Sequence, residues 1–177
     1  NIKGIVLSSI EGTTSTYESS NELTNQLHKN IQRSLLGNHV SIPTDCPQRD
    51  ERMGWTGDAQ VFSRTATYYG DMNLLYEGWE GTIRDAQTAS GTIPQTAPNL
   101  GWGASVEVAW PAAIVIPTWE IYKQYGNTRV IESNLDAMKA FLDSIGNDKF
   151  APDSYLTKGT ALTEHLALVG TDSPLCS

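Results

Sequence analysis

Hydrophobic residues recur every three or four positions over most of this chain, which is the spacing of amphipathic helices. The first helix is expected over residues 21–36, begun by Ser20 as N-cap and ended by Gly37. Its apolar side chains fall on one face and are Leu23, Leu27, Ile31 and Leu35.

Four further helices follow from the same pattern. They are expected over residues 59–70 (begun by Asp58), 71–90, 106–125 and 128–145. The fourth is apolar nearly all round, which is typical of a buried helix, and carries Pro111 and Pro117 near its start or at kinks. The last should turn one set of side chains inward: Val130, Ile131, Leu135, Met138, Phe141, Leu142 and Ile145.

The first residues follow a different pattern. Residues 2–9 are rich in β-formers and lead into a Gly, Thr and Ser segment, which predicts a short strand and a linker. A lone strand is not stable, so it either pairs with a later segment of this chain or, as we expect, is the last strand of a preceding β-sandwich domain. Residues 1–18 would then close that domain, and residues 19–177 would begin a helical one.

The predicted fold class is mainly α. Amphipathic and apolar helices alternate and are joined by polar loops, as in antiparallel hairpins arranged in two layers. This alternation predicts part of an α/α toroid of the six-hairpin barrel type, with the short N-terminal strand left from the preceding domain.

Composition narrows the partners. The 177 residues are 39% hydrophobic and 18% charged, which is ordinary for a globular protein. Twenty acidic and twelve basic residues give a net charge of −8, which argues against a nucleic-acid partner. No apolar run reaches the roughly 18 residues of a membrane span. Cys46 and Cys176 lack metal-ligand spacing, their oxidation state stays open, and so does the compartment.

One stretch, TDCPQRDERMGWTGD at residues 44–58, fits neither helix nor strand. It carries four carboxylates and two guanidinium groups, with Pro43 and Pro47 excluding a helix and two glycines allowing sharp turns. Carboxylates, an arginine and a tryptophan in one concavity can hold a sugar, and a carboxyl group there can act as a general acid. A solvated charged loop remains the alternative.

The string DCPQRDERMGWTGDAQ, residues 45–60, resembles the signature of bacterial-type α-L-rhamnosidases, glycoside hydrolase family 78. The flanking SNELTNQLHKNI, WEGTIRDAQTASGTIPQTAP, GWG and YGNTRVIE segments agree, so the resemblance covers nearly the whole chain. It implies inverting hydrolysis of terminal α-L-rhamnose from rhamnosylated glycosides or polysaccharides. No cofactor and no metal are expected.

The resemblance also implies roles for single residues. Glu51 would be the general acid, and Asp45, Arg49 and Asp58 would hold the sugar hydroxyls. The remaining implied contacts are Trp55, packed on the sugar, Trp102 in the same pocket, and His165. The match at His165 is looser, since Thr163-Glu164 stands where the family usually has Gly-Asp. Outside this set, His28 and His39 are expected in surface or capping roles, and Cys46 and Trp79 in packing.

An inverting glycosidase also needs a general base, which in this family is a Glu from a much later hairpin. No acid of this chain stands in that context, so the base is expected from a later segment outside it, and the chain is expected to be a fragment. Two alternatives stay open. One is a catalytically silent rhamnose-binding fragment, and the other is a toroid glycosidase with a different sugar specificity.

Overall fold

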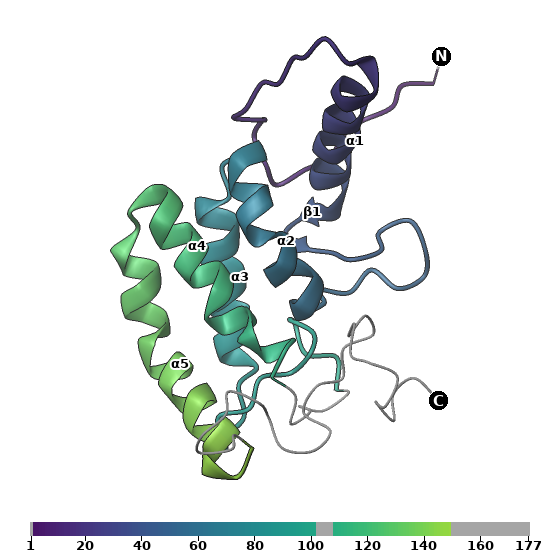
Figure 1. Cartoon of the computed structure of the whole chain (residues 1–177). Coiled ribbons are helices and arrows are strands. Elements are labelled where there is room, and N and C mark those ends of the chain that lie inside the picture. Colours follow the sequence, from purple (N-terminus) through teal and green to yellow (C-terminus); the bar gives the residue numbers. More distant parts are fainter. Residues whose placement is uncertain (1, 102–107, 150–177) are drawn as a thin grey trace, which may run out of the picture.

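The computed structural model describes residues 2–101 and 108–149 (Figure 1). Within these residues the chain is mainly helical. It forms α1 (Glu22–Asn38), two-residue strands β1 (His39–Val40) and β2 (Ile42–Pro43), α2 (Thr56–Tyr69), α3 (Asn73–Asp85), the 3-10 helix η1 (Pro111–Ile114), α4 (Ile116–Tyr125) and α5 (Thr128–Lys149).

Helix α4 is the centre of the arrangement, because it packs against α2, α3, α5 and η1 (Figure 1). The face that α2 turns inward is made of small or polar side chains, including Thr56, Ser63 and Thr67, which permit close packing. Gly57 is the extreme case, since a Cβ there would lie 2.6 Å from the indole of Trp110. The large buried side chains include Leu35, Met72, Tyr76, Trp79, Ile83, Ile93, Ile114, Ile121 and Phe141.

The helix ends follow local chemistry, with some corrections to the prediction. Asn21, not Ser20, caps α1, and its side chain accepts a hydrogen bond from the Leu23 amide at 2.9 Å. The helix continues through Gly37 to Asn38. Helix α4 begins only at Ile116, because Pro117 fits a first turn but not a helix interior. Gly126 ends α4 as expected, with φ of +66°.

The inward faces are narrower than the sequence predicted. In α1 only Leu35 is buried, while Leu23 is 80% exposed, because α1 lies at the edge and contacts β1 and α2. In α5, Leu135 and Leu142 are exposed rather than inward. The buried stripe of α5 is Val130, Asn134, Ala137, Phe141 and Ile145.

The predicted strand over residues 2–9 is not confirmed. Residues 2–7 have no regular structure, and Ile2, Ile5 and Val6 are exposed. A strand needs a hydrogen-bonded partner, and the described residues give this segment none. The chain joins the helices just afterwards, where the Ser9 amide donates to the His39 carbonyl at 2.9 Å and Thr13 pairs with Gly70 in an isolated bridge. The domain boundary near residue 18 stays a prediction.

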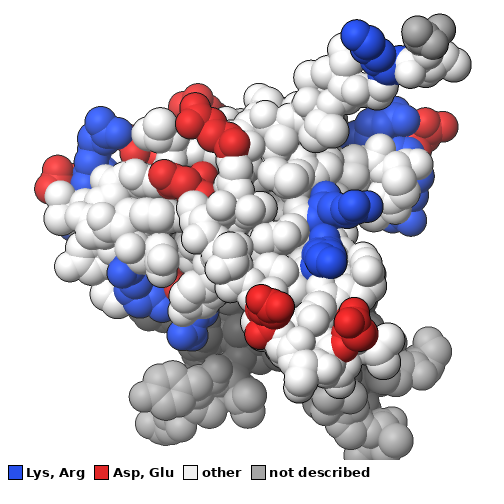
Figure 2. Space-filling model, turned by 90° about the horizontal axis from the view of Figure 1, so that it is seen from above, with Lys and Arg blue, Asp and Glu red and all other residues white. Residues whose placement is uncertain are grey.

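Two surface properties bear on partners. Among the described residues, no helix has the length and apolar character needed to cross a bilayer. Figure 2 shows basic and acidic side chains scattered over one face, and no broad basic area covers the coloured part of that face. Broad basic areas are the surfaces with which proteins bind the phosphate backbone of nucleic acids.

Candidate active site

The charged loop between β2 and α2 is irregular but firmly held at its base. The Asp45 amide donates to the Met53 carbonyl at 3.1 Å, which closes the loop on itself. At its far end, the Thr56 amide and hydroxyl both donate to the Gln95 carbonyl, at 2.8 and 2.9 Å, and Trp55 pairs with Thr96 in an antiparallel bridge. These hydrogen bonds to residues 95–96 of the same chain hold the loop in place, although it contains no helix or strand.

The second loop supports the first. The Ala97 amide donates to the Gly54 carbonyl at 2.9 Å, and the Trp79 indole donates to the Ala97 carbonyl at 3.1 Å. Trp79 is 1% exposed, so its expected packing role is confirmed. A Cβ on Gly54 would come within 2.2 Å of the Ala97 oxygen, so the approach of the two loops requires glycine.

Glu51 is held by two side chains, one on each carboxylate oxygen. Arg49 donates from Nε to Oε2 at 2.6 Å, and a second guanidinium nitrogen pairs with the same oxygen. The Trp55 indole donates from Nε1 to Oε1 at 2.8 Å. The Glu51 side chain is 21% exposed, so solvent and ligands can reach it. The hydrogen bond to Glu51 also raises the pKa of the Arg49 guanidinium, which keeps it charged.

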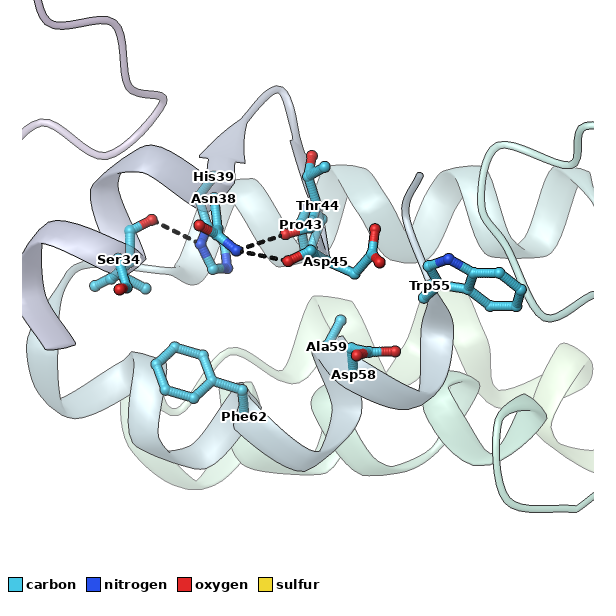
Figure 3. Close-up of a pocket in the computed structure, with 11 residues that line it drawn as sticks. Ser34, Asn38, His39, Pro43, Thr44, Asp45, Trp55, Asp58, Ala59 and Phe62 are labelled. Carbon is cyan, nitrogen blue, oxygen red and sulfur yellow. Dashed lines mark hydrogen bonds between the residues drawn. The ribbon is translucent and has the colours of Figure 1, made fainter. Parts of the chain in front are cut away.

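A pocket of about 220 Å³ opens between the end of α1, β2 and the start of α2 (Figure 3). Asp45, Trp55 and Asp58 line one end, and in Figure 3 both carboxylates lie toward the indole. The other end is more apolar. The remaining residues that line the pocket are Ser34, Leu35, Asn38, His39, Pro43, Thr44, Ala59 and Phe62.

The structure therefore places five of the predicted site residues in one region, but with a division of contacts that the sequence did not indicate. Asp45, Trp55 and Asp58 line the pocket. Arg49 contacts Glu51, and Trp55 contacts Glu51 as well as the pocket. Trp102 and His165 lie outside the described residues.

Two residues near the site were not predicted to belong to it. Trp110 packs on Gly57 in the first turn of α2, next to Asp58. The glycine itself was the only sign in the sequence that another residue approaches closely there. Asn38 contacts the loop through its side chain, and nothing in the sequence pattern marks it. His39, expected at the surface or as a cap, is the C-cap of α1 and is 4% exposed, so its capping role is confirmed and its surface role is not. Its Nδ1 donates to the Leu35 carbonyl at 2.9 Å, and burial lowers the pKa of its imidazole.

One group of side chains has the spacing of metal ligands. Single ligand atoms of Asp45, Cys46 and Glu51 lie within 4.8 Å of one another. A hydrogen bond to Asp45 raises the pKa of the Cys46 thiol, with burial and the Asp45 charge adding to the shift, and only the thiolate is a good ligand or nucleophile. Both Glu51 oxygens already accept hydrogen bonds. The arrangement favours hydrogen bonding over metal binding.

Comparison with known proteins gives one consistent result. Residues 12–167 match the profile of the bacterial alpha-L-rhamnosidase 6 hairpin glycosidase domain. An α-L-rhamnosidase of Formosa agariphila is 40% identical over 141 residues, which are 80% of this chain and 15% of that protein. One from Streptomyces avermitilis is 36% identical over 141 residues, which are 80% of this chain and 14% of that protein.

Solved structures agree. The α-L-rhamnosidase of Streptomyces avermitilis complexed with L-rhamnose superposes with a TM-score of 0.73 and 37% identity, covering 77% of this chain and 13% of that one. Native α-L-rhamnosidase from Aspergillus terreus gives a TM-score of 0.73 and 40% identity, covering 77% and 16%. The chain spans about 15% of the length of its curated relatives. It belongs to the bacterial α-L-rhamnosidase six-hairpin glycosidase domain family, and the predicted α/α-toroid fold class is confirmed.

Proposed function

We propose that this chain carries the sugar-binding and acid half of an inverting α-L-rhamnosidase, with Glu51 as the general acid. The observation that supports the proposal most directly is the fixed Glu51 carboxylate. It is oriented by Arg49 and Trp55 and lies in the same loop as the carboxylate of Asp45. The substrates would be rhamnosylated glycosides or polysaccharides.

The pocket suits one sugar ring. Its volume of about 220 Å³ is below the roughly 300–1,000 Å³ of pockets for drug-sized ligands. Asp45 and Asp58 offer carboxylate oxygens, which accept hydrogen bonds from sugar hydroxyls. The indole of Trp55 offers an aromatic face for the apolar side of the ring.

Proton transfer would begin at Glu51. A protonated Glu51 gives its proton to the glycosidic oxygen as the bond from that oxygen to the anomeric carbon breaks, and the departing group leaves as an alcohol. The carboxylate that remains is stabilised by Arg49, whose guanidinium already contacts it. Trp55 keeps the other oxygen in place throughout this step.

The general base would come from a segment outside these 177 residues. Carboxyl groups of an inverting pair stand roughly 6.5–9.5 Å apart, which leaves room for the attacking water. Asp45 and Glu51 have ligand oxygens within 4.8 Å of each other, so Asp45 is too close to serve as that base. The same spacing favours a second candidate function for the chain alone, which is rhamnose binding without hydrolysis.

The test uses p-nitrophenyl α-L-rhamnoside with two proteins: this chain, and an extended protein that carries it together with the rest of the six-hairpin domain. We expect the chain to bind L-rhamnose without turnover and the extended protein to hydrolyse the substrate. Proton NMR of the first product should then reveal the β-anomer of rhamnose.

Three results would contradict parts of this proposal. An α-anomer as first product would replace inversion with a retaining reaction. Turnover by the chain alone would place a base within it. If neither protein binds rhamnose and the extended protein hydrolyses another aryl glycoside, the protein is a glycosidase specific for a different sugar.

A further inference from the structure

Asn38, the last residue of α1, holds the start of the charged loop between β2 and α2 through three hydrogen bonds. Its side-chain amide donates to the Thr44 carbonyl at 2.9 Å and to the Asp45 carbonyl at 3.0 Å (Figure 3). Its backbone carbonyl accepts from the Thr44 amide at 2.7 Å. The β1–β2 turn lies between these contacts and is therefore closed at its base by one residue.

The contacts fix the backbone on both sides of the Asp45 side chain. The Asp45 carbonyl is held by Asn38, and the Asp45 amide is held by the Met53 carbonyl at 3.1 Å. With both peptide groups held, the direction of the Cα–Cβ bond is set, and only side-chain rotamers remain free. The carboxylate is thereby directed to the end of the pocket that Trp55 and Asp58 line.

The amide group of the Asn38 side chain suits this position, whereas a carboxylate would not. The amide nitrogen of asparagine has two N–H groups, one for each carbonyl oxygen. An aspartate at this position offers oxygens only and would repel both carbonyls. Its charge would also be unfavourable at the C-terminal end of a helix.

We propose that Asn38 is a positioning residue for sugar binding, which acts by aiming the Asp45 carboxylate into the pocket. The inference rests on the proposed function in one respect, namely that Asp45 contacts the sugar. A purely structural role for Asn38 would instead lower stability without any specific coupling to Asp45.

The experiment has a ligand-free part and a ligand-bound part, both done on the full 177-residue chain. Asn38→Asp and Asn38→Ala are compared with Asn30→Asp, which makes the same chemical change at an exposed position of α1. An aspartate at position 30 can still accept the hydrogen bond that the Gln26 side chain donates there. Hydrogen exchange of the Thr44 and Asp45 amides is measured first. We expect at least tenfold faster exchange in both Asn38 variants and no change in the control.

Binding of L-rhamnose is then measured in a double-mutant cycle with Asp45→Ala. We expect about a tenfold or greater loss of affinity for each Asn38 variant in the parent background and almost none once Asp45 is alanine, because the effect passes through that side chain. The conservative variant Asn38→Gln, which keeps the amide, should recover part of the affinity.

The outcomes separate the two proposals. Unchanged exchange at Thr44 and Asp45 overturns the role of Asn38, whether or not the chain binds rhamnose. Lost protection with equal affinity losses in both Asp45 backgrounds also overturns it. A parent chain that fails to bind rhamnose contradicts the proposed function, while the exchange data still decide whether Asn38 holds the loop.

Discussion

Two glutamates in this molecule are treated in opposite ways by their surroundings. Glu51, in the loop, is partly exposed and accepts hydrogen bonds from Arg49 and Trp55. Glu80, in α3, is 0% exposed, and neither of its oxygens accepts a hydrogen bond of good geometry within the described residues, although the Thr118 hydroxyl lies close by. Burial raises the pKa of Glu80 well above its usual value, and nearby Thr118 and Arg84 oppose the shift only in part.

The polar groups around Glu80 satisfy one another instead. Arg84 donates to the side-chain oxygen of Asn134, and Asn134 donates to the Thr118 hydroxyl at 2.8 Å. Thr118 in turn donates to the Ile114 carbonyl at 3.0 Å. A carboxyl group in such a place stays neutral because burial penalises its charge more than the nearby Thr118 and Arg84 compensate it. The difference teaches that the hydrogen-bond donors around a glutamate, rather than the residue type, decide whether the charge of its carboxylate is compensated.

The largest effect should come from Glu51→Gln in the extended protein. We expect kcat for p-nitrophenyl α-L-rhamnoside to fall by about 10²–10⁴, because the leaving oxygen loses its proton donor. A dinitrophenyl rhamnoside, whose leaving group needs no proton, should lose far less. Steady-state kinetics on both substrates measures this difference.

Glu80→Gln is the matched control, since it makes the same chemical change in the core. Its kcat should equal that of the parent on both substrates. An equal loss with the two leaving groups in Glu51→Gln would remove the acid role from Glu51.

The second effect concerns stability. In the folded state Glu80 keeps its proton at pH values where the unfolded chain has lost it, so the folded state binds more protons above about pH 4.5. The free energy of unfolding therefore falls as pH rises from that value toward the folded pKa. Glu80→Gln removes this loss, and we expect it to stabilise the protein at pH 8 by roughly 1–3 kcal/mol.

Urea unfolding at pH 5 and pH 8 measures the difference between the two proteins. Burial lowers the pKa of His39, but this residue is present in both proteins, so its contribution cancels in the comparison. A variant that is no more stable than the parent at pH 8 would mean that Glu80 is solvated in a way that the fold does not indicate.

The smallest effect should come from Trp55→Phe, which removes the N–H donor to Glu51 and keeps an aromatic face for the sugar. We expect kcat to fall about tenfold with little change in KM, because the lost hydrogen bond orients the acid. A rise in KM at constant kcat would instead place the indole N–H on the substrate.

The sequence predicted most of the features that depend on helical periodicity or on a known motif. Helix spacing located the five α-helices of the described residues, and the 45–60 string brought Asp45, Arg49, Glu51, Trp55 and Asp58 into one hypothesis. The exposed Leu135 and Leu142 were misplaced because periodicity gives a face but not how much of it a neighbour covers. Asn38 was missed because its role depends on a carbonyl seven residues away across a turn.

The strand at residues 2–9 illustrates a related limit. Its composition favours extended backbone, but pairing depends on a partner that the local sequence does not name. The contacts of Arg49 and Trp55 were likewise assigned to the sugar alone, whereas in the structure both side chains donate to Glu51, two and four residues from them.

The two glycines beside Trp55 limit how this loop could be reused by a protein engineer. Gly54 leaves room for the Ala97 carbonyl, and Gly57 leaves room for the Trp110 indole, more than forty and fifty residues further along the chain. The signature string therefore packs against residues that lie outside it, and its glycines are fitted to them. Grafting residues 45–58 onto another helical scaffold would transfer Glu51 without the groups that pack against the two glycines, so a working transplant would have to carry Ala97 and Trp110 as well.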